Sequence, residues 1–201
     1  MPDMKEIIFA TQNSHKVEEI RAALNDDLSI VTLGEAGLFI EIPEPFDTLE
    51  QNAMEKARVI HQLTGKNCFG EDTGLEVDAL QGEPGVKSAR YAGEERDFKK
   101  NTEKLLYKLR DEENRRAKFR TVIALILDNE SHYFEGVCEG NILEAPHGDM
   151  GFGYDPVFQP TGASKSFAEM TTHEKNKYSH RRKAMDQLVN FLREKQGLRQ
   201  S

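Results

Sequence analysis

The sequence predicts an α/β protein built around a mixed sheet. A strand-sized apolar run, KEIIFA at 5–10, is followed at once by a polar turn and a helix-forming segment. Farther along, KFRTVIALILDNESHYFEGVCEGNIL at 118–143 offers two long strands, joined by turn-forming residues at Asp128 to Ser131. A βα unit and an antiparallel hairpin in one chain imply a sheet that contains both strand directions.

The first two helices follow from apolar residues at helical spacing. Val17, Ile20 and Leu24 stand at i, i+3 and i+7 of VEEIRAALNDD and predict one core-facing stripe. A second helix is predicted to begin at Thr48, which has capping-box spacing to Gln51, and to end at Gly65. Its predicted buried side consists of Leu49, Ala53, Ala57 and Ile60.

The remaining elements are predicted in the same way. The segment 67–85 has short apolar runs interrupted by glycines, which indicates a strand, a tight loop and a second short strand. A third helix at 97–114 is predicted to bury Phe98, Leu105, Leu106 and Leu109. A last helical segment, from about Thr172 to Lys195, is predicted to bury Ala184, Leu188, Phe191 and Leu192.

Composition bounds the class of protein. The chain has 201 residues, enough for one domain or two closely packed lobes, and 37% hydrophobic with 31% charged residues is typical of a soluble globular protein. No apolar run reaches the length of a bilayer span and no secretory signal is recognisable, so we expect a cytoplasmic location. Cys68 and Cys138 are then expected to be reduced and buried. A formal charge of −8 argues against a broad nucleic-acid footprint.

The polar turn TQNSHK at 11–16 is a candidate phosphate cradle. It stands between a strand and a helix, where unpaired helix N–H groups favour an anion, and Thr11, Asn13 and Lys16 add side-chain donors. Many such turns are polar only because they cap the helix, and this alternative stays open.

The adjacent carboxylates of Glu71 and Asp72, in GEDTG at 70–74, are candidate Mg²⁺ ligands. One of them is also a candidate proton acceptor for an attacking water. Turn chemistry alone favours a β-turn with solvated acids. Glu41 and Glu44 in EIPEPF are further carboxylates that folding could bring to the same metal.

Lys56 and the basic residues at 175–181 are candidate ligands, but each can also be interpreted as ordinary solvated surface charge. Lys56 on the second helix is more typical of a solvated lysine than of a ligand. Lys175, His180 and Arg181 bring hydrogen-bond donors together near the start or a break of the last helix, where a solvated charge run is the other interpretation.

The loop GFGYDP at 151–156 presents an aromatic ring beside a carboxylate. Phe152 is a candidate platform for a stacked nucleobase, and Asp155 can accept a hydrogen bond from a base N–H. An aromatic anchor that pins the loop to the core is the alternative. A phosphate cradle, metal carboxylates, a stacking ring and donors to a base together indicate a nucleoside triphosphate.

Several motifs in fixed order carry a resemblance to a known family. They are T-x-N-x-x-K at 11–16, QNAMEKA at 51–57, DTGLEVDAL at 72–80, PGVKSARYAG at 84–93, GFGYDPVF at 151–158 and SHR at 179–181. In these motifs, and over nearly its whole length, the chain resembles the non-canonical purine nucleoside triphosphate pyrophosphatases, also called inosine triphosphate or dITP/XTP pyrophosphatases.

The resemblance implies hydrolysis of ITP, dITP or XTP to the monophosphate and pyrophosphate with Mg²⁺. It implies an elongated mixed α/β fold, a single domain over 1–201 whose two lobes enclose the nucleotide in a central cleft, usually in a homodimer. Asp72 and Lys56 would be catalytic, and Asp72, Glu71 and Glu44 would hold the metal. The substrate-binding residues implied are Thr11, Gln12, Asn13, Ser14, His15, Lys16, Thr73, Phe152, Gly153, Tyr154, Asp155, Lys175, His180 and Arg181. Glu71 and Thr73 replace the Asp and Ser frequent in that family, so which carboxylate meets the metal stays open.

Two other classes of function compete with an enzyme. A non-hydrolytic nucleotide sensor would need only the cradle and the ring, but carboxylates beside a triphosphate repel it unless a metal intervenes, which favours the enzyme. A nucleic-acid-binding protein could use the basic SHRRK segment, against which the net charge counts.

Overall fold

The computed structural model describes residues 6–23 and 29–195, and the predicted core residue Leu24 lies outside them. The chain divides into two compact units. Unit 1 comprises Met1–Asp72, Thr121–Gly136 and Arg181–Ser201, and unit 2 comprises Thr73–Arg120 and Val137–His180.

The sheet is mixed, as predicted. Its strands are β1 (Glu6–Phe9), β2 (Ser29–Thr32), β3 (Cys68–Val77), β4 (Pro84–Gly85), β5 (Arg116–Leu127), β6 (Glu130–Ile142) and β7 (Phe158–Pro160). Hydrogen-bonded neighbours run in the order β2-β1-β3-β5-β6-β7, with β4 on β3. Strand β1 is parallel to β2 and β3, whereas β3 with β4 and β6 with β7 are antiparallel.

The helices are α1 (Ser14–Ala23), α2 (Leu49–Thr64), α3 (Phe98–Lys108), α4 (Thr172–Lys175) and α5 (His180–Lys195). Short 3₁₀ helices occupy Asp78–Leu80, Ser88–Arg90, Asp155–Val157 and Phe167–Glu169. None of the helices in the described ranges is long and apolar enough to cross a membrane.

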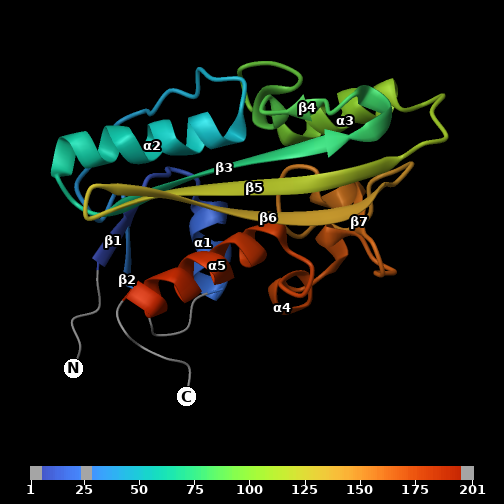
Figure 1. The fold of residues 1–201 in the computed structure, drawn as a ribbon. Coiled ribbons are helices and arrows are strands. Elements are labelled where there is room, and N and C mark those ends of the chain that lie inside the picture. The colour runs from blue at the N-terminus through green and yellow to red at the C-terminus, as the bar shows by residue number, and fades with distance from the viewer. Residues whose placement is uncertain (1–5, 24–28, 196–201) are drawn as a thin grey trace. The chain divides into compact units, whose positions relative to one another are not determined.

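In unit 1, α2 forms as its sequence predicts. The hydroxyl oxygen of Thr48 accepts the backbone N–H of Gln51 at 3.2 Å, and Gly65 ends the helix with a positive φ of 65°. The predicted buried side is confirmed, and Asn52, Met54 and Lys56 are buried with it. In Figure 1, α2 lies on one side of the sheet and α5 on the other.

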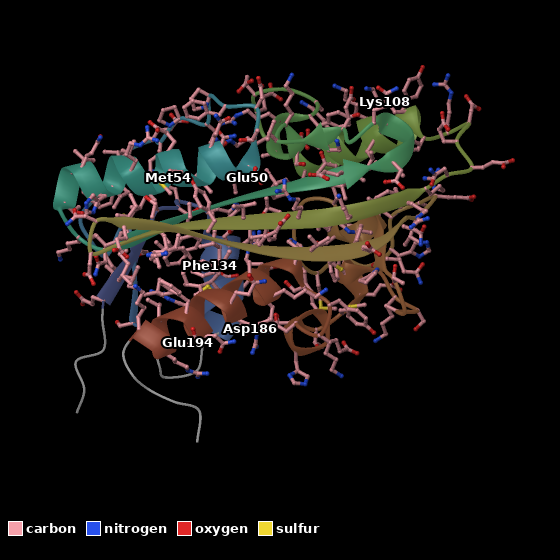
Figure 2. The ribbon with its side chains drawn as sticks, in the orientation of Figure 1. Glu50, Met54, Lys108, Phe134, Asp186 and Glu194 are labelled. Carbon is pink, nitrogen blue, oxygen red and sulfur yellow. The ribbon has the colours of Figure 1, made fainter. Side chains whose placement is uncertain are left out.

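The hydrophobic core of unit 1 joins the sheet to α1 and α5. Phe134 points from β6 toward α5, while Asp186 and Glu194 point away from the sheet (Figure 2). The rings of Phe134 and Phe191 are 5.4 Å apart. The predicted hairpin is also confirmed, but its turn is shorter than predicted: Glu130 and Ser131 already belong to β6. Asp128 and Asn129 have φ 52° and 67°, the conformation that a tight two-residue turn requires.

The predicted strand, tight loop and second short strand within residues 67–85 are confirmed by β3 and β4, but the β-turn alternative for GEDTG is wrong. The segment GEDTG is not a turn but the middle of one continuous strand, Cys68–Val77. Its glycines serve close packing, because a Cβ on Gly70 would lie 2.1 Å from the carbonyl oxygen of Ala53 in α2, and one on Gly74 would lie 2.7 Å from that of Gly85 in β4.

Unit 2 has its own core around Phe119, Phe158 and Phe167, whose rings pack against one another. Helix α3 begins after Asp97, whose carboxylate accepts the Lys100 N–H at 3.0 Å. Leu105 and Leu109 are buried as predicted, and Leu106 packs against this core. The prediction for Phe98 was wrong: this residue is 39% exposed, because it stands in the first turn beside the loop at 151–155.

The predicted last helical segment is interrupted. Helix α4 starts with a capping box between Thr171 and Glu174 and ends at Lys175, and α5 begins only at His180. The intervening stretch has no apolar residue at helical spacing except Tyr178, so no buried stripe favours a continuous helix. Cys68 and Cys138 are both free and buried, which confirms the expectation for them.

Candidate functional site

Side chains of the turn before α1 cap that helix. The side-chain oxygen of Asn13 accepts the N–H of Lys16 at 3.3 Å, and the hydroxyl oxygen of Thr11 accepts the N–H of Asn13 at 3.2 Å. Gln12 donates to the carbonyl oxygen of Ile40 at 2.6 Å. The capping interpretation is therefore correct for Asn13. It leaves phosphate binding open for the N–H groups of the first turn, because a cap satisfies only some of them.

Glu71 and Asp72 lie in the middle of β3, where successive side chains point to opposite faces of the sheet. They accordingly have different partners. The Asp72 carboxylate faces α2, where Lys56 stands, and the Glu71 carboxylate meets Lys16 of α1 and Arg181 of α5. The two acids, adjacent in sequence, thus belong to two separate clusters of unit 1.

The first of these, the acid–lysine cluster, consists of Glu44, Lys56 and Asp72. The ammonium nitrogen of Lys56 lies 2.5 Å from Oε1 of Glu44 and 3.2 Å from Oδ1 of Asp72, and it donates to the carbonyl oxygen of Glu71 at 3.0 Å. Lys56 and Asp72 are 6% and 7% exposed, so the solvated-lysine alternative is wrong.

Burial and neighbouring charges shift both titratable groups. Burial raises the pKa of Asp72, while Lys56 and Lys16 lower it and Glu44 raises it further. Burial lowers the pKa of Lys56, but the negative charges of Asp72 and Glu44 outweigh burial, so that pKa ends above its usual value. The Lys56 cation thus lies between the carboxyl groups of Glu44 and Asp72, and the pKa of Asp72 is above its usual value.

The second cluster, the Arg181 network, consists of Lys16, Glu19, Glu71 and Arg181. Nε and Nη2 of Arg181 donate to the two oxygens of Glu71 at 3.0 and 3.3 Å, and Nη1 donates to Oε2 of Glu19. Lys16 Nζ is 3.3 Å from Oε1 of Glu71. Burial alone would lower the pKa of Arg181, but Glu71 and Glu19 raise it above its ordinary value. Burial lowers the pKa of Lys16 despite Glu71.

The acid–lysine cluster has a donor set that fits a hard divalent cation. Among residues 6–23 and 29–195, no group of three or more His, Cys, Asp and Glu side chains converges closely enough to hold a metal unaided. One or two carboxylates completed by phosphate oxygens are, however, the usual surroundings of Mg²⁺. Glu44 and Asp72 approach the same ammonium and fit that pattern, whereas both oxygens of Glu71 are taken by Arg181 and Lys16.

In unit 2, the predicted base-binding loop at 151–155 is held by Asp155. Its Oδ2 accepts the backbone N–H of Phe152 at 2.9 Å and the ammonium of Lys175 at 2.7 Å. Gly151 has φ 75°, and a Cβ there would lie 2.1 Å from that same oxygen. A glycine is therefore required for the carboxylate to close the loop.

Phe152 is half-buried, with its ring 6.0 Å from that of Phe98 and Lys175 Nζ 5.5 Å from its centre. The cation also lies 5.1 Å from the centre of the Phe167 ring. One ring thus stays partly accessible beside a cation and a buried carboxylate. The loop has a flat apolar surface and two charged groups, which together suit a polar heterocycle.

Tyr154 illustrates the alternative interpretation of this loop. It is buried, its hydroxyl donates to the carbonyl oxygen of Ser88 at 2.7 Å, and burial raises the pKa of that hydroxyl. Tyr154 is thus the anchor of the loop, and Phe152 is its partly accessible ring. The structure also places His180 on Phe119, with the two rings stacked 4.7 Å apart. Thr73 and Gly153 are half-buried, and Ser14 and His15 open α1.

The Ham1 family model matches residues 7–191 of the chain. The chain belongs to the Ham1 family. A dITP/XTP pyrophosphatase of Porphyromonas gingivalis is 52% identical over 190 residues, which are 94% of this chain and 98% of that relative. A dITP/XTP pyrophosphatase of Flavobacterium psychrophilum is 45% identical over 188 residues, 94% of this chain and 99% of the relative.

Solved structures of the Ham1 family have the same fold. The HAM1 protein of Coxiella burnetii is 37% identical with a TM-score of 0.87, and the match covers 95% of this chain and 100% of that chain. The Ham1 protein of Staphylococcus aureus has a TM-score of 0.86 at 37% identity, with the same coverage. The mixed α/β fold with flanking helices, predicted from the sequence, is confirmed.

Sequence reasoning did not name Glu19 and wrongly placed Phe98 in the hydrophobic core. Glu19 contacts Arg181, and its position three residues after Lys16 on α1 is the signal that could have revealed it, because such residues share a helix face. Phe98 supports Phe152 instead of the core. Arg181, predicted to bind the base, has all three guanidinium nitrogens bonded to carboxylates of unit 1.

Proposed function

We propose that this chain is a metal-dependent pyrophosphatase that hydrolyses ITP, dITP and XTP to the nucleoside monophosphate and pyrophosphate, removing these nucleotides from the pool. The observation that carries the proposal is the acid–lysine cluster, a buried cation held between two carboxylates. The family membership and the activity in the names of the relatives agree with it.

The acid–lysine cluster is the proposed centre of the reaction. Mg²⁺ held by Asp72 and Glu44 would neutralise phosphate charge and polarise the phosphorus that water attacks. Lys56 positions both carboxylates and adds positive charge near the triphosphate. Lys16 and the N–H groups of the first turn of α1 bind phosphate oxygens. Positioning of this kind does most of the work in phosphoryl chemistry.

Asp72 is the proposed proton acceptor. Water adds to the α-phosphorus, and its proton passes to a carboxylate oxygen of Asp72. The bond from the α-phosphorus to the oxygen that bridges the α- and β-phosphates breaks, and pyrophosphate leaves. A carboxylate positioned beside the attacking water can accept its proton.

The loop at 151–155 and its neighbours are the proposed base-binding group. The Phe152 ring stacks on the purine, and Lys175 and His180 donate to a 6-oxo group. Adenine, with a 6-amino group, would leave these donors unsatisfied, which costs binding free energy. Hypoxanthine and xanthine are therefore favoured over adenine.

The experiment that tests the proposed substrates is a product assay with Mg²⁺ on ITP, XTP, dITP, ATP and GTP. We expect pyrophosphate from the first three, far faster than from ATP or GTP. Orthophosphate as product, or equal rates on all five, would contradict the proposal. Tight binding of ITP without turnover would indicate a nucleotide sensor instead.

The proposal also includes an oligomeric state and a cellular location. We expect a homodimer, which light scattering after gel filtration would detect as twice the mass of one chain. We also expect the protein in the cytoplasm, and cell fractionation would test that location.

A further inference from the structure

We propose that Glu19 is a positioning residue that holds the Lys16 ammonium in the phosphate cradle through Arg181 and Glu71. The inference rests on the proposed function, in which Lys16 binds phosphate oxygens. It assigns Glu71 a part in the same device, not in metal binding. All four residues lie in unit 1.

The contacts form a continuous chain. Oε1 of Glu71 is 3.3 Å from Lys16 Nζ and also accepts Nη2 of Arg181 at 3.3 Å, while Oε2 accepts Nε at 3.0 Å. The third nitrogen of Arg181, Nη1, donates to Glu19. The chain therefore runs from Glu19 on α1 through α5 and β3 back to Lys16 on α1.

The geometry of the guanidinium explains why Glu19 matters. Two parallel N–H bonds fix the plane of the Glu71 carboxylate, because guanidinium and carboxylate meet as rigid forks. Glu19 in turn fixes the guanidinium on its remaining side. Arg181 and Glu71 are 2% and 1% exposed, so close packing restricts both side chains. Lys16 thus contacts an acceptor whose orientation is restricted.

Charge alone predicts the opposite effect of removing Glu19. The formal charges of the network, formed by Lys16, Arg181, Glu19 and Glu71, sum to zero. Replacing Glu19 by a neutral residue therefore leaves a net charge of +1 near the cradle. Electrostatic attraction would then strengthen the binding of an anionic phosphate chain. If Glu19 positions Lys16, the same substitution weakens binding. The sign of the change distinguishes the two roles.

The test uses inorganic tripolyphosphate, which has no base, and isothermal titration calorimetry in EDTA, so that neither metal nor nucleobase takes part. We expect Glu19→Gln and Lys16→Ala each to raise the Kd roughly 10-fold, the loss of one charge-assisted contact. The double variant should bind no more weakly than Lys16→Ala alone, because Glu19 acts through that lysine. Glu18→Gln is the matched control, since Glu18 is the exposed neighbour on α1, and should stay within about 2-fold.

Each outcome decides a separate point. A lower or unchanged Kd in Glu19→Gln, or additive losses in the double variant, would overturn the positioning role. An unchanged Kd in Lys16→Ala would contradict the proposed phosphate site itself. If Glu19→Gln unfolds, Glu19→Asp, which keeps the charge but shortens the reach to Arg181, replaces it with the same expected coupling to Lys16.

Discussion

Glu71 and Asp72 are adjacent in β3, yet their carboxylates engage different cations: Oδ1 of Asp72 lies 3.2 Å from Lys56 Nζ, and Oε2 of Glu71 lies 3.0 Å from Nε of Arg181. The strand geometry that separates them also separates their proposed roles. In the proposed mechanism, Asp72 acts with Glu44 on the metal and the attacking water. Glu71 is proposed to order Lys16, the proposed phosphate-binding lysine, from the other face of the sheet.

Glu44 should set the metal requirement. Replacing it by Gln removes one of two proposed carboxylate ligands, and we expect roughly 10–100-fold more Mg²⁺ for half-maximal activity, the loss typical of altered metal surroundings. Glu41→Gln is the control, because Glu41 is exposed three residues earlier in the same loop. Titration of ITP turnover with Mg²⁺ measures both. Equal requirements in the two variants would remove Glu44 from the metal site.

Phe152 should contribute to nucleotide binding and not to phosphate binding. Phe152→Ala removes the stacking surface, worth about 1–3 kcal/mol per base, so the Kd for ITP should rise by roughly 5–150-fold. The Kd for tripolyphosphate should not change. Tyr107→Ala, on an exposed ring of α3, controls for loss of an aromatic side chain. A parallel loss for both ligands would show that Phe152 only supports the fold.

Gly151 and Gly153 offer a matched pair of substitutions in one loop. Both have positive φ, 75° and 64°, so alanine strains either by about 1–2 kcal/mol. A Cβ added at Gly151 would lie 2.1 Å from Oδ2 of Asp155. A Cβ added at Gly153 would have no atom within 4 Å. Gly151→Ala should therefore lower the melting temperature more and raise the KM for ITP. Indistinguishable variants would mean that Asp155 does not close the loop.

Cys68 should make stability sensitive to alkaline pH. Burial raises the pKa of its thiol from 9.0 to about 12. The folded state therefore holds this proton more tightly than the unfolded state, so the stabilisation is complete below pH 9 and is lost as the pH rises toward 12. Cys68→Ala should reduce the decline in unfolding free energy across this window by up to about 1.4 kcal/mol per pH unit. Urea denaturation at several pH values measures the slope, and equal slopes would contradict the burial effect.

The sequence predicted best where a local signal and the tertiary structure agree. Thr48 and Gly65 bound α2 as expected, because a cap and a left-handed glycine are local devices. The β-turn alternative at Gly70 and Gly74 was wrong because glycine is needed in turns and also where two elements pack closely together. Only the neighbouring backbone decides between these two uses of glycine.

The candidate residues show the same limit. The identity of individual residues indicated sites for phosphate, metal and nucleobase. It did not indicate which side chains each of these residues would contact. Lys56 looked solvated because charged helix residues usually are, and only the two carboxylates around it explain its burial. Arg181 stood beside His180 in a basic run, yet the start of α5 directs it to Glu71 and Glu19.

The most direct test of the acid–lysine cluster as the reaction centre is pyrophosphate release from ITP with Mg²⁺ by the native chain and by Asp72→Asn. Circular dichroism and ITP binding would be measured on the same samples. We expect the variant to fold and bind ITP but to release pyrophosphate at least about 10²–10⁴-fold more slowly, the usual contribution of a positioned base. A folded variant that keeps the native rate would contradict the account.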